Sequence, residues 1–156
     1  MSGHEERVRA LIYRASRFLD DEEWDNFLNL CTPDFRYRVT AFSPELRKKM
    51  LWFDHDRESL KPLFDMVPQH LRRLGTLLRH VSVGTIDSIG GDGTMTMVSV
   101  VSTFQCTHTD HEGRSHLLAV GRYFDTVDVG GPAPLIKARE TYLETRDLGI
   151  GSHVPL

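Results

Sequence analysis

The sequence predicts an α+β fold in which N-terminal helices cover one face of a curved antiparallel sheet. Apolar residues recur at helical spacing through the first 31 residues and again over 57–67. Beyond Gly75, long segments rich in Val, Thr, Ile and aromatic residues are separated by short turn-forming clusters. Helices followed by a strand meander is an α+β order, and a sheet of this kind often curls into a cone.

The bulk composition is that of one ordinary globular domain, which we place at 1–156. The chain has 156 residues, of which 40% are apolar and 26% are charged. A formal net charge of -3 lacks the basic excess that nucleic-acid binding favours. The polar N-terminus and the absence of an apolar run of ~20 residues predict no signal and no membrane span, hence a cytoplasmic protein.

Two helices are expected before the first strand. Residues 5–19 carry one apolar stripe, with arginines on much of the remaining surface. The acidic run 20–23 then suits the positive end of a second helix, in which apolar spacing continues to Cys31. Pro33 is expected to end that helix.

The middle of the chain is less regular. Residues 35–42 alternate with period two, as a half-buried strand does. Residues 43–56 show no clean period and are interpreted as an excursion, partly helical. A third helix fits 57–67, with Pro68 expected to stop or kink it and a short continuation towards Leu74.

Four consecutive antiparallel strands are expected in the second half of the chain. They are residues 77–89, 94–109, 115–129 and 135–147, joined by hairpin turns. Residues 148–156 contain Gly149, Gly151 and Pro155, which predicts an extended tail packed on a neighbour or on the surface of the sheet.

No complete metal or cofactor motif is present. Cys106-Thr107-His108 is half of a Rieske [2Fe-2S] signature, but the other half is missing because the only other cysteine, Cys31, has no histidine three positions on. The histidine and carboxylate runs at 54–56 and 108–111 match no known ligand spacing. We therefore expect no cofactor and no metal in this chain, and two reduced, packed thiols.

Two alternative functions use the inside of the predicted cone. Tyr37 and His80 could face one cavity, with Asp34 or Asp125 orienting the imidazole, which would suit an isomerase or dehydratase. The same cavity could instead hold a small ligand without chemistry. A tyrosine within an alternating apolar set is, however, often a core aromatic with a satisfied hydroxyl.

Several strings in a common order resemble one family over nearly the whole chain. They are WDNFLNLCTPDFRYRV (24–39), LLRHVSVGTI (77–86), VGRYFDTV (120–127) and KARETYLETRDLGIGSHVPL (137–156). They are similar to the small (β) subunits of Rieske non-heme iron aromatic-ring-hydroxylating dioxygenases, a branch of the cystatin-like, nuclear transport factor 2-like cone fold. SPELRKKMLWFDHDR (43–57) and the ending LGIGSHVPL look closer to the methanesulfonate- and terephthalate-type oxygenases.

The resemblance implies a partner subunit without catalytic residues of its own. In that family three large (α) and three small subunits assemble, and the small subunits form a trimeric base. The large chain carries the Rieske cluster and a mononuclear iron held by two histidines and one carboxylate. Electrons come from NADH through a reductase, with or without a ferredoxin. The implied role is support of aromatic-compound or sulfonate catabolism.

A supporting subunit needs interface residues, and the irregular segment supplies candidates. Met50, Trp52 and Phe53 are apolar side chains that a monomer would expose at a cost, and interfaces bury such anchors. We predict that Trp52 or Phe53 lies in an interface with another chain, with Met50 and Leu156 as further candidates.

Overall fold

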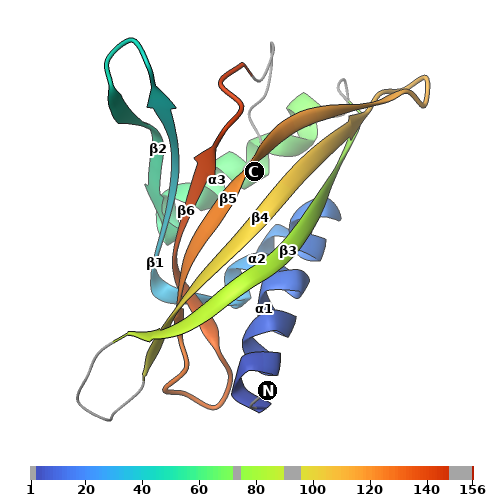
Figure 1. Cartoon of the computed structure of the whole chain (residues 1–156). Coiled ribbons are helices and arrows are strands. Elements are labelled where there is room, and N and C mark those ends of the chain that lie inside the picture. The colour runs from blue at the N-terminus through green and yellow to red at the C-terminus, as the bar shows by residue number, and fades with distance from the viewer. Residues whose placement is uncertain (1–2, 72–74, 90–95, 148–155) are drawn as a thin grey trace.

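Six strands form one curved sheet, and three helices pack on one of its faces in the computed structural model of the chain (Figure 1). The structure describes residues 3–71, 75–89, 96–147 and 156. Within these residues the helices precede or interrupt the strands, as the α+β prediction required. We call the helix-covered face of the sheet the cone interior.

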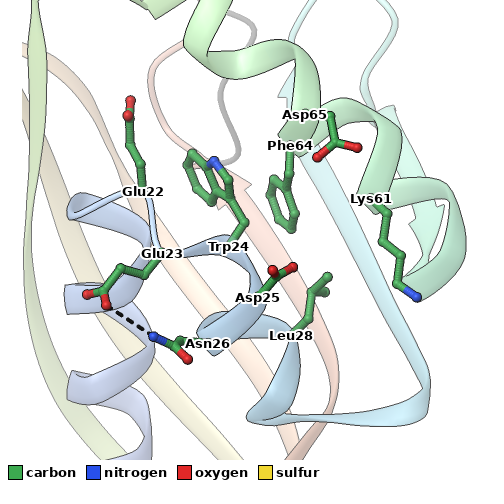
Figure 2. Close-up of a pocket in the computed structure, with 9 residues that line it drawn as sticks. All are labelled: Glu22, Glu23, Trp24, Asp25, Asn26, Leu28, Lys61, Phe64 and Asp65. Atoms are coloured by element: carbon green, nitrogen blue, oxygen red, sulfur yellow. Dashed lines mark hydrogen bonds between the residues drawn. The ribbon is translucent and has the colours of Figure 1, made fainter.

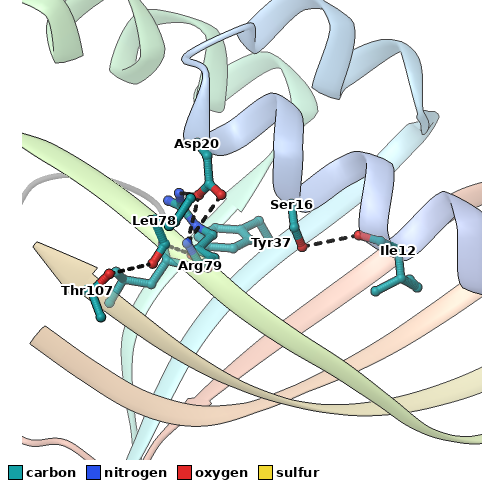
Figure 3. A network of polar contacts seen from close by, with 8 residues as sticks. Ile12, Ser16, Asp20, Tyr37, Leu78, Arg79 and Thr107 are labelled. Carbon is teal, nitrogen blue, oxygen red and sulfur yellow. Dashed lines mark hydrogen bonds and ion pairs between the residues drawn. The ribbon is translucent and has the colours of Figure 1, made fainter. Parts of the chain in front are cut away.

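Helix α1 (Gly3–Asp20) follows the predicted pattern and lies along β3 (Thr76–Ile89). Its apolar stripe is almost completely buried. Asp20 at its last turn accepts hydrogen bonds from the backbone amide and the guanidinium of Arg79 on β3, the latter at 2.7 Å (Figure 3). Both side chains are nearly inaccessible, at 0% for Arg79 and 10% for Asp20, so this ion pair fixes the end of α1 to the sheet.

The second helix is shorter than predicted. Helix α2 (Trp24–Asn29) has six residues, and strand β1 (Cys31–Ser43) already begins at Cys31. The predicted helix position of Cys31 is therefore wrong. The residue before a proline is driven towards extended backbone by the proline ring, so Pro33 acts before its own position and favours a strand at Thr32.

Helix α3 (Arg57–Leu71) also departs from the prediction, because it continues beyond Pro68. Asp56 caps its first turn by accepting a hydrogen bond from the amide of Ser59 at 2.8 Å. Leu60 and Phe64 on its inner side are 1% and 2% exposed. Packing of this face stabilises the helix enough to tolerate the hydrogen bond that an internal proline removes.

The segment 43–56 is not a partly helical excursion but contains a strand, β2 (Lys48–Asp56), paired antiparallel with β1. Val39 lies opposite Phe53, whereas Thr40 lies opposite Leu51, so Trp52 is the extra residue of a β-bulge. A bulge shifts the inside and outside alternation by one position. For this reason no clean period was visible in the sequence.

The remaining strands confirm the predicted hairpins. Strands β4 (Met97–Thr109), β5 (Ser115–Asp128) and β6 (Leu135–Leu143) follow β3, and each consecutive pair is antiparallel. The strand order is β2-β1-β6-β5-β4-β3. The sheet is not wholly antiparallel as predicted, because β1 and β6 pair in parallel at its middle. After edge strand β2, helix α3 carries the chain across to β3 at the opposite edge of the sheet. Strands β3 to β6 then run back antiparallel to one another until β6 lies beside β1 (Figure 1).

One glycine is required by close packing in this sheet. A Cβ added at Gly121 on β5 would lie 2.1 Å from the carbonyl oxygen of Tyr142 and 3.0 Å from the Phe104 ring. Any larger residue would push β5 away from β6 or displace the ring.

Two sequence predictions concern residues that the structure does not describe. The continuation of the third helix to Leu74 and the extended tail over 148–155 lie outside the described residues. Among the described helices, none combines the length and the apolar character needed to cross a membrane.

Candidate functional site

The cone interior is crossed by a buried ion pair between neighbouring strands. Arg139 on β6 donates from Nε to Oδ1 of Asp125 on β5 at 2.7 Å, and from Nη2 to Oδ2 at 3.0 Å. Both side chains are 0% exposed. A bidentate ion pair of this kind compensates the charge of each group and fixes the orientation of both side chains.

Aromatic rings pack against this pair. The guanidinium carbon of Arg139 lies 4.0 Å from the centre of the Tyr123 ring, and that ring stacks on Phe104 with centroids 4.3 Å apart. Tyr123 is 0% exposed and Phe104 is 3% exposed. The middle of the cone is thus a stack of cation, tyrosine and phenylalanine layers rather than an open, solvated cleft.

Burial controls ionisation in this interior. Desolvation raises the pKa of Tyr123 and of Tyr37, which keeps both phenols neutral at physiological pH. Desolvation lowers the pKa of Arg139, but Asp125 together with Tyr123 and Tyr37 more than offsets it, so the pKa of the guanidinium is raised overall. None of these three shifts moves a group towards the neutral-pH poise that general acid-base catalysis uses.

The hydroxyl of Tyr37 forms hydrogen bonds with the main chain of Leu156 in the same chain. Its hydroxyl donates to the carbonyl oxygen of Leu156 at 3.0 Å and accepts from the Leu156 amide at 3.0 Å. Thr141 Oγ1 donates to the same carbonyl at 3.2 Å. Tyr37 is 2% exposed and Leu156 is 3% exposed. Leu156, expected at an interface, therefore lies in the core of its own chain.

The predicted catalytic set is not brought together. His80 is exposed, because it follows the buried Arg79 on β3 and successive strand residues point to opposite faces. Tyr37 faces the interior instead. Asp125 is engaged by Arg139, and the exposed Asp34 accepts from Lys137 and Thr32, whose hydrogen bonds lower the pKa of that carboxyl. The convergence of Tyr37 and His80 on one cavity was thus a wrong expectation.

The two cysteines are buried and free. Desolvation raises the pKa of Cys31 to about 12 and also raises the pKa of Cys106. Strands β6 and β5 separate β1, which carries Cys31, from β4, which carries Cys106, so the thiols do not meet as neighbours. Among the residues that the structure describes, no group of three or more histidine, cysteine or acidic side chains is arranged to hold a metal ion.

The histidine and carboxylate runs have local contacts of their own. Asp54 accepts from Arg36 at 2.7 Å, and Asp56 caps α3. Asp110 accepts from the amides of Glu112 and Arg114 in the β4–β5 turn. These carboxylates therefore hold a strand pair, a helix end and a turn.

The three interface candidates on edge strand β2 differ in their exposure to solvent. Trp52, the bulge residue, is 43% exposed. Phe53 is half-buried and packs its ring edge-to-face on Tyr37 with centroids 5.7 Å apart, while Met50 is half-buried. Bulges re-aim side chains at sheet edges, and here the bulge leaves one large aromatic available to solvent or to a partner.

The outer face of the sheet adds further exposed apolar groups. Phe42, Leu51 and Phe124 are 44%, 54% and 41% exposed. Polar contacts surround them, including Lys49 to Glu140 at 2.8 Å. We call Trp52 with these three residues the outer apolar surface.

A pocket lies between α2 and α3, apart from the cone interior (Figure 2). It measures about 520 Å³, and the Trp24 and Phe64 rings stack in it with centroids 4.7 Å apart. Acidic side chains line most of its polar part: Glu22, Glu23, Asp25 and Asp65. None of the predicted site residues contributes to it.

Sequence reasoning missed Arg139, Tyr123 and the Arg79–Asp20 pair. A signal was present, because Arg139 and Asp125 occupy apolar-face positions of two consecutive strands. Opposite charges at inward positions of adjacent strands indicate a buried pair. The alternation of β6 around Arg139 could have revealed it.

Comparison with known proteins agrees with this geometry. The SnoaL-like domain family matches residues 3–130. The chain is 37% identical to the methanesulfonate monooxygenase hydroxylase β subunit of Methylosulfonomonas methylovora, over 96% of this chain and 85% of that protein. It is 29% identical to the 2-aminobenzenesulfonate 2,3-dioxygenase β subunit of an Alcaligenes species, over 96% and 97%.

The fold is shared with solved oxygenase subunits. The β subunit of benzoate 1,2-dioxygenase from Burkholderia mallei superposes with a TM-score of 0.68, at 17% identity and over 88% of each chain. The observed cone with its helical cover defines a SnoaL-like domain. Within that class, the chain belongs to the family of oxygenase β subunits, which confirms the resemblance seen in the sequence.

Proposed function

We propose that this chain is the structural β subunit of a Rieske-type oxygenase and that it supports assembly of the iron-bearing large subunits. The observation that carries the proposal is the contrast between interior and surface. The cone interior is filled by a compensated ion pair and stacked rings, whereas large apolar side chains lie exposed on edge strand β2 and the outer face. Exposed apolar side chains of this kind favour contact with another protein chain, and the filled interior does not favour binding of a substrate.

The finer architecture follows the family resemblance. We infer three large and three small subunits, with the small subunits forming a homotrimeric base. The large subunit would carry the [2Fe-2S] cluster and the mononuclear iron. Electrons would come from NADH through a reductase, with or without a ferredoxin. We infer that the complex works in the cytoplasm.

The relatives also suggest a substrate class for the complex. Both curated relatives are named for organosulfonates, methanesulfonate and 2-aminobenzenesulfonate. We infer that the assembled oxygenase acts on an organosulfonate, aliphatic or aromatic, and that the large subunit binds it.

Co-expression with the large subunit of the oxygenase tests the proposal. The two chains are expected to co-purify in equal amounts, with a mass that fits three of each and with iron only on the large chain. Light scattering of the complex and iron analysis of the separated chains provide the readout. Stoichiometric iron on this chain alone, or a large subunit that assembles and turns over equally well without it, would overturn the proposal.

A further inference from the structure

A β-bulge places two histidines directly opposite each other on strands β4 and β5. The pairing register of the two strands shifts ahead of His108, so Leu118 is an extra residue on β5. Beyond the bulge, His108 lies opposite His116. In an unbroken register Leu117 would lie opposite His108, and His116 would point to the other face of the sheet. The bulge therefore brings the two imidazoles together near the β4–β5 turn.

The two imidazoles have the spacing of ligands to one metal ion. Their ring centroids lie 4.9 Å apart, with an interplanar angle of 63°. A Zn²⁺ ion that binds two imidazole nitrogens at about 2.0–2.1 Å, with a roughly tetrahedral angle between them, would hold the ring centres about 5 Å apart. The spacing of His108 and His116 therefore fits a chelating pair.

His108 lacks the polar partners that a half-buried imidazole needs. Its Nδ1 and Nε2 atoms are both buried, and neither has a hydrogen-bond partner among the described residues. On the β3 side His108 lies opposite the half-buried, apolar Leu77, which supplies no side-chain partner. Buried polar atoms without a partner are uncommon in native proteins. A metal ion held between the two rings would give one His108 nitrogen the partner that it lacks.

The turn that follows adds negative charge beside the pair. Asp110 stands two residues after His108, and its Oδ1 accepts hydrogen bonds from the amides of Glu112 and Arg114, both at 2.9 Å. The guanidinium of Arg114 pairs with the carboxylate of Glu112 at 3.1 Å. The charge of Asp110 is thus left without a cationic partner within the turn. A negative charge at this position favours the approach of a cation.

We propose that His108 and His116 bind one divalent transition-metal ion of the zinc type, and that this ion links the ends of β4 and β5 at their connecting turn. Imidazole nitrogen is a preferred ligand of Zn²⁺, and water or the carboxylate of Asp110 would complete the coordination. His116 is exposed, so the ion can enter from solvent. The ion would be exchangeable and separate from the iron that we infer for the large subunit.

The sequence expectation of no metal rested on ligand spacings along the chain. This pair forms across two strands and depends on the bulge, which no spacing along the chain reveals. With two histidines, the pair is also smaller than the groups of three or more metal-binding side chains that are absent from the described part of the chain.

Zinc binding by the full chain tests this site. Titration calorimetry at about pH 7.5, where an unperturbed histidine is mostly neutral, is expected to show one Zn²⁺ ion bound per wild-type chain. His116→Gln and His108→Gln should each weaken this binding by roughly tenfold or more. His80→Gln is the matched control and should bind Zn²⁺ as the wild-type chain does, because the exposed His80 on β3 lies opposite Gln105 and not opposite a second histidine.

Two further measurements define the ion and its effect. Mg²⁺ prefers oxygen ligands, so it should not displace Zn²⁺ from the two imidazoles. Hydrogen exchange measures the link between the strands: Zn²⁺ should slow exchange of the amides near the β4–β5 turn in the wild-type chain and leave it unchanged in His116→Gln.

Either of two results would overturn the proposal. One is a His116→Gln chain that binds Zn²⁺ as tightly as the wild-type chain does. The other is a wild-type chain whose amides near the β4–β5 turn exchange at the same rate with and without Zn²⁺. If His108→Gln does not fold, His116→Gln decides the matter, because its side chain is exposed. Assembly with the large subunit is measured separately by co-expression, so failure of the metal site leaves the proposed function untouched.

Discussion

The guanidinium of Arg139 and the carboxylate of Asp125 form a two-pronged ion pair in the centre of the cone, with N–O distances of 2.7 and 3.0 Å and no solvent exposure of either side chain. Neighbouring strands β6 and β5 carry the two groups, opposite each other in register. The pair therefore connects β5 and β6 and occupies the centre of the cone with two charged side chains that have no access to solvent.

Breaking this pair is expected to destabilise the chain strongly. Asp125→Asn leaves a buried guanidinium without its counter-charge, which should lower the free energy of unfolding by about 3–5 kcal/mol. Urea denaturation followed by circular dichroism measures the change. The control is Glu144→Gln, which removes the exposed Arg122–Glu144 pair, whose side chains are 52% and 55% exposed, and should cost under about 1 kcal/mol. Equal costs for the two variants would contradict a structural role for the buried pair.

Glu140 is expected to make stability dependent on acid pH. Burial raises the pKa of this carboxyl. Hydrogen bonds from Lys49 and Thr40 lower the pKa by more than burial raises it, so the pKa in the folded chain lies below that in the unfolded chain. A depressed pKa contributes stability that is present above the unfolded value, about 4.3, and is lost as the pH falls through the folded value.

Urea unfolding tests this dependence. The unfolding midpoint is measured for the wild-type chain and for Glu140→Gln at several values from about pH 6 down to about pH 3. The wild-type chain should be the more stable at pH 6, and the difference should shrink as the pH falls. Leu78→Ala, which replaces an exposed side chain that does not ionise, is the control, and its difference from the wild-type chain should stay constant with pH. A constant difference between Glu140→Gln and the wild-type chain over the whole range would refute the proposed linkage.

Trp52 is expected to contribute to assembly. Trp52→Ala removes an aromatic side chain that is 43% exposed and carries little of the chain's own packing, so the isolated chain should stay folded while its association with partner chains weakens by roughly tenfold or more. Pull-down with the tagged large subunit, together with the sedimentation of the isolated chain, measures both kinds of contact. Leu78→Ala on β3 at the opposite edge, 52% exposed, is the matched control. Undiminished assembly of the Trp52 variant would argue against this edge as an interface.

Cys31 and Cys106 are expected to be unreactive in the folded chain. Burial raises the pKa of both thiols, that of Cys31 to about 12, and the thiolate is the reactive form. Iodoacetamide at pH 8 should therefore label neither residue until urea unfolds the chain, as intact-mass spectrometry would show. Rapid labelling of either cysteine in the native state would mean that its strand opens readily.

Gly121→Ala is expected to disturb the centre of the sheet. The added Cβ would lie 2.1 Å from the Tyr142 carbonyl oxygen, so β5 and β6 must separate at a cost of about 1–3 kcal/mol. A lowered Tm is the readout. Gly113→Ala in the β4–β5 turn is a useful comparison: its Cβ meets no atom within 4 Å, and only the positive φ of 82° opposes it. A smaller loss for Gly121→Ala than for Gly113→Ala would contradict the packing argument.

The sequence by itself determined the family and the order of all elements except strand β2. Helical periodicity located α1 and α3, period-two alternation located β1, and turn clusters delimited the last four strands, because these signals arise from contacts with one local face. The order and spacing of the four strings at 24–39, 77–86, 120–127 and 137–156 together indicated the family, which the relatives confirm.

Only the tertiary structure decided what fills the cone. The bulge at Trp52 hid strand β2 because it shifts the alternation, and the parallel pairing of β1 with β6 depends on a crossover that no local pattern encodes. His80 and Tyr37 were separated by the facing of their strands, not by their chemistry. Arg139 contacts Asp125 because β6 pairs with β5 in that register. Leu156 contacts Tyr37 across 119 residues of chain. Only the folded chain brings such distant residues together.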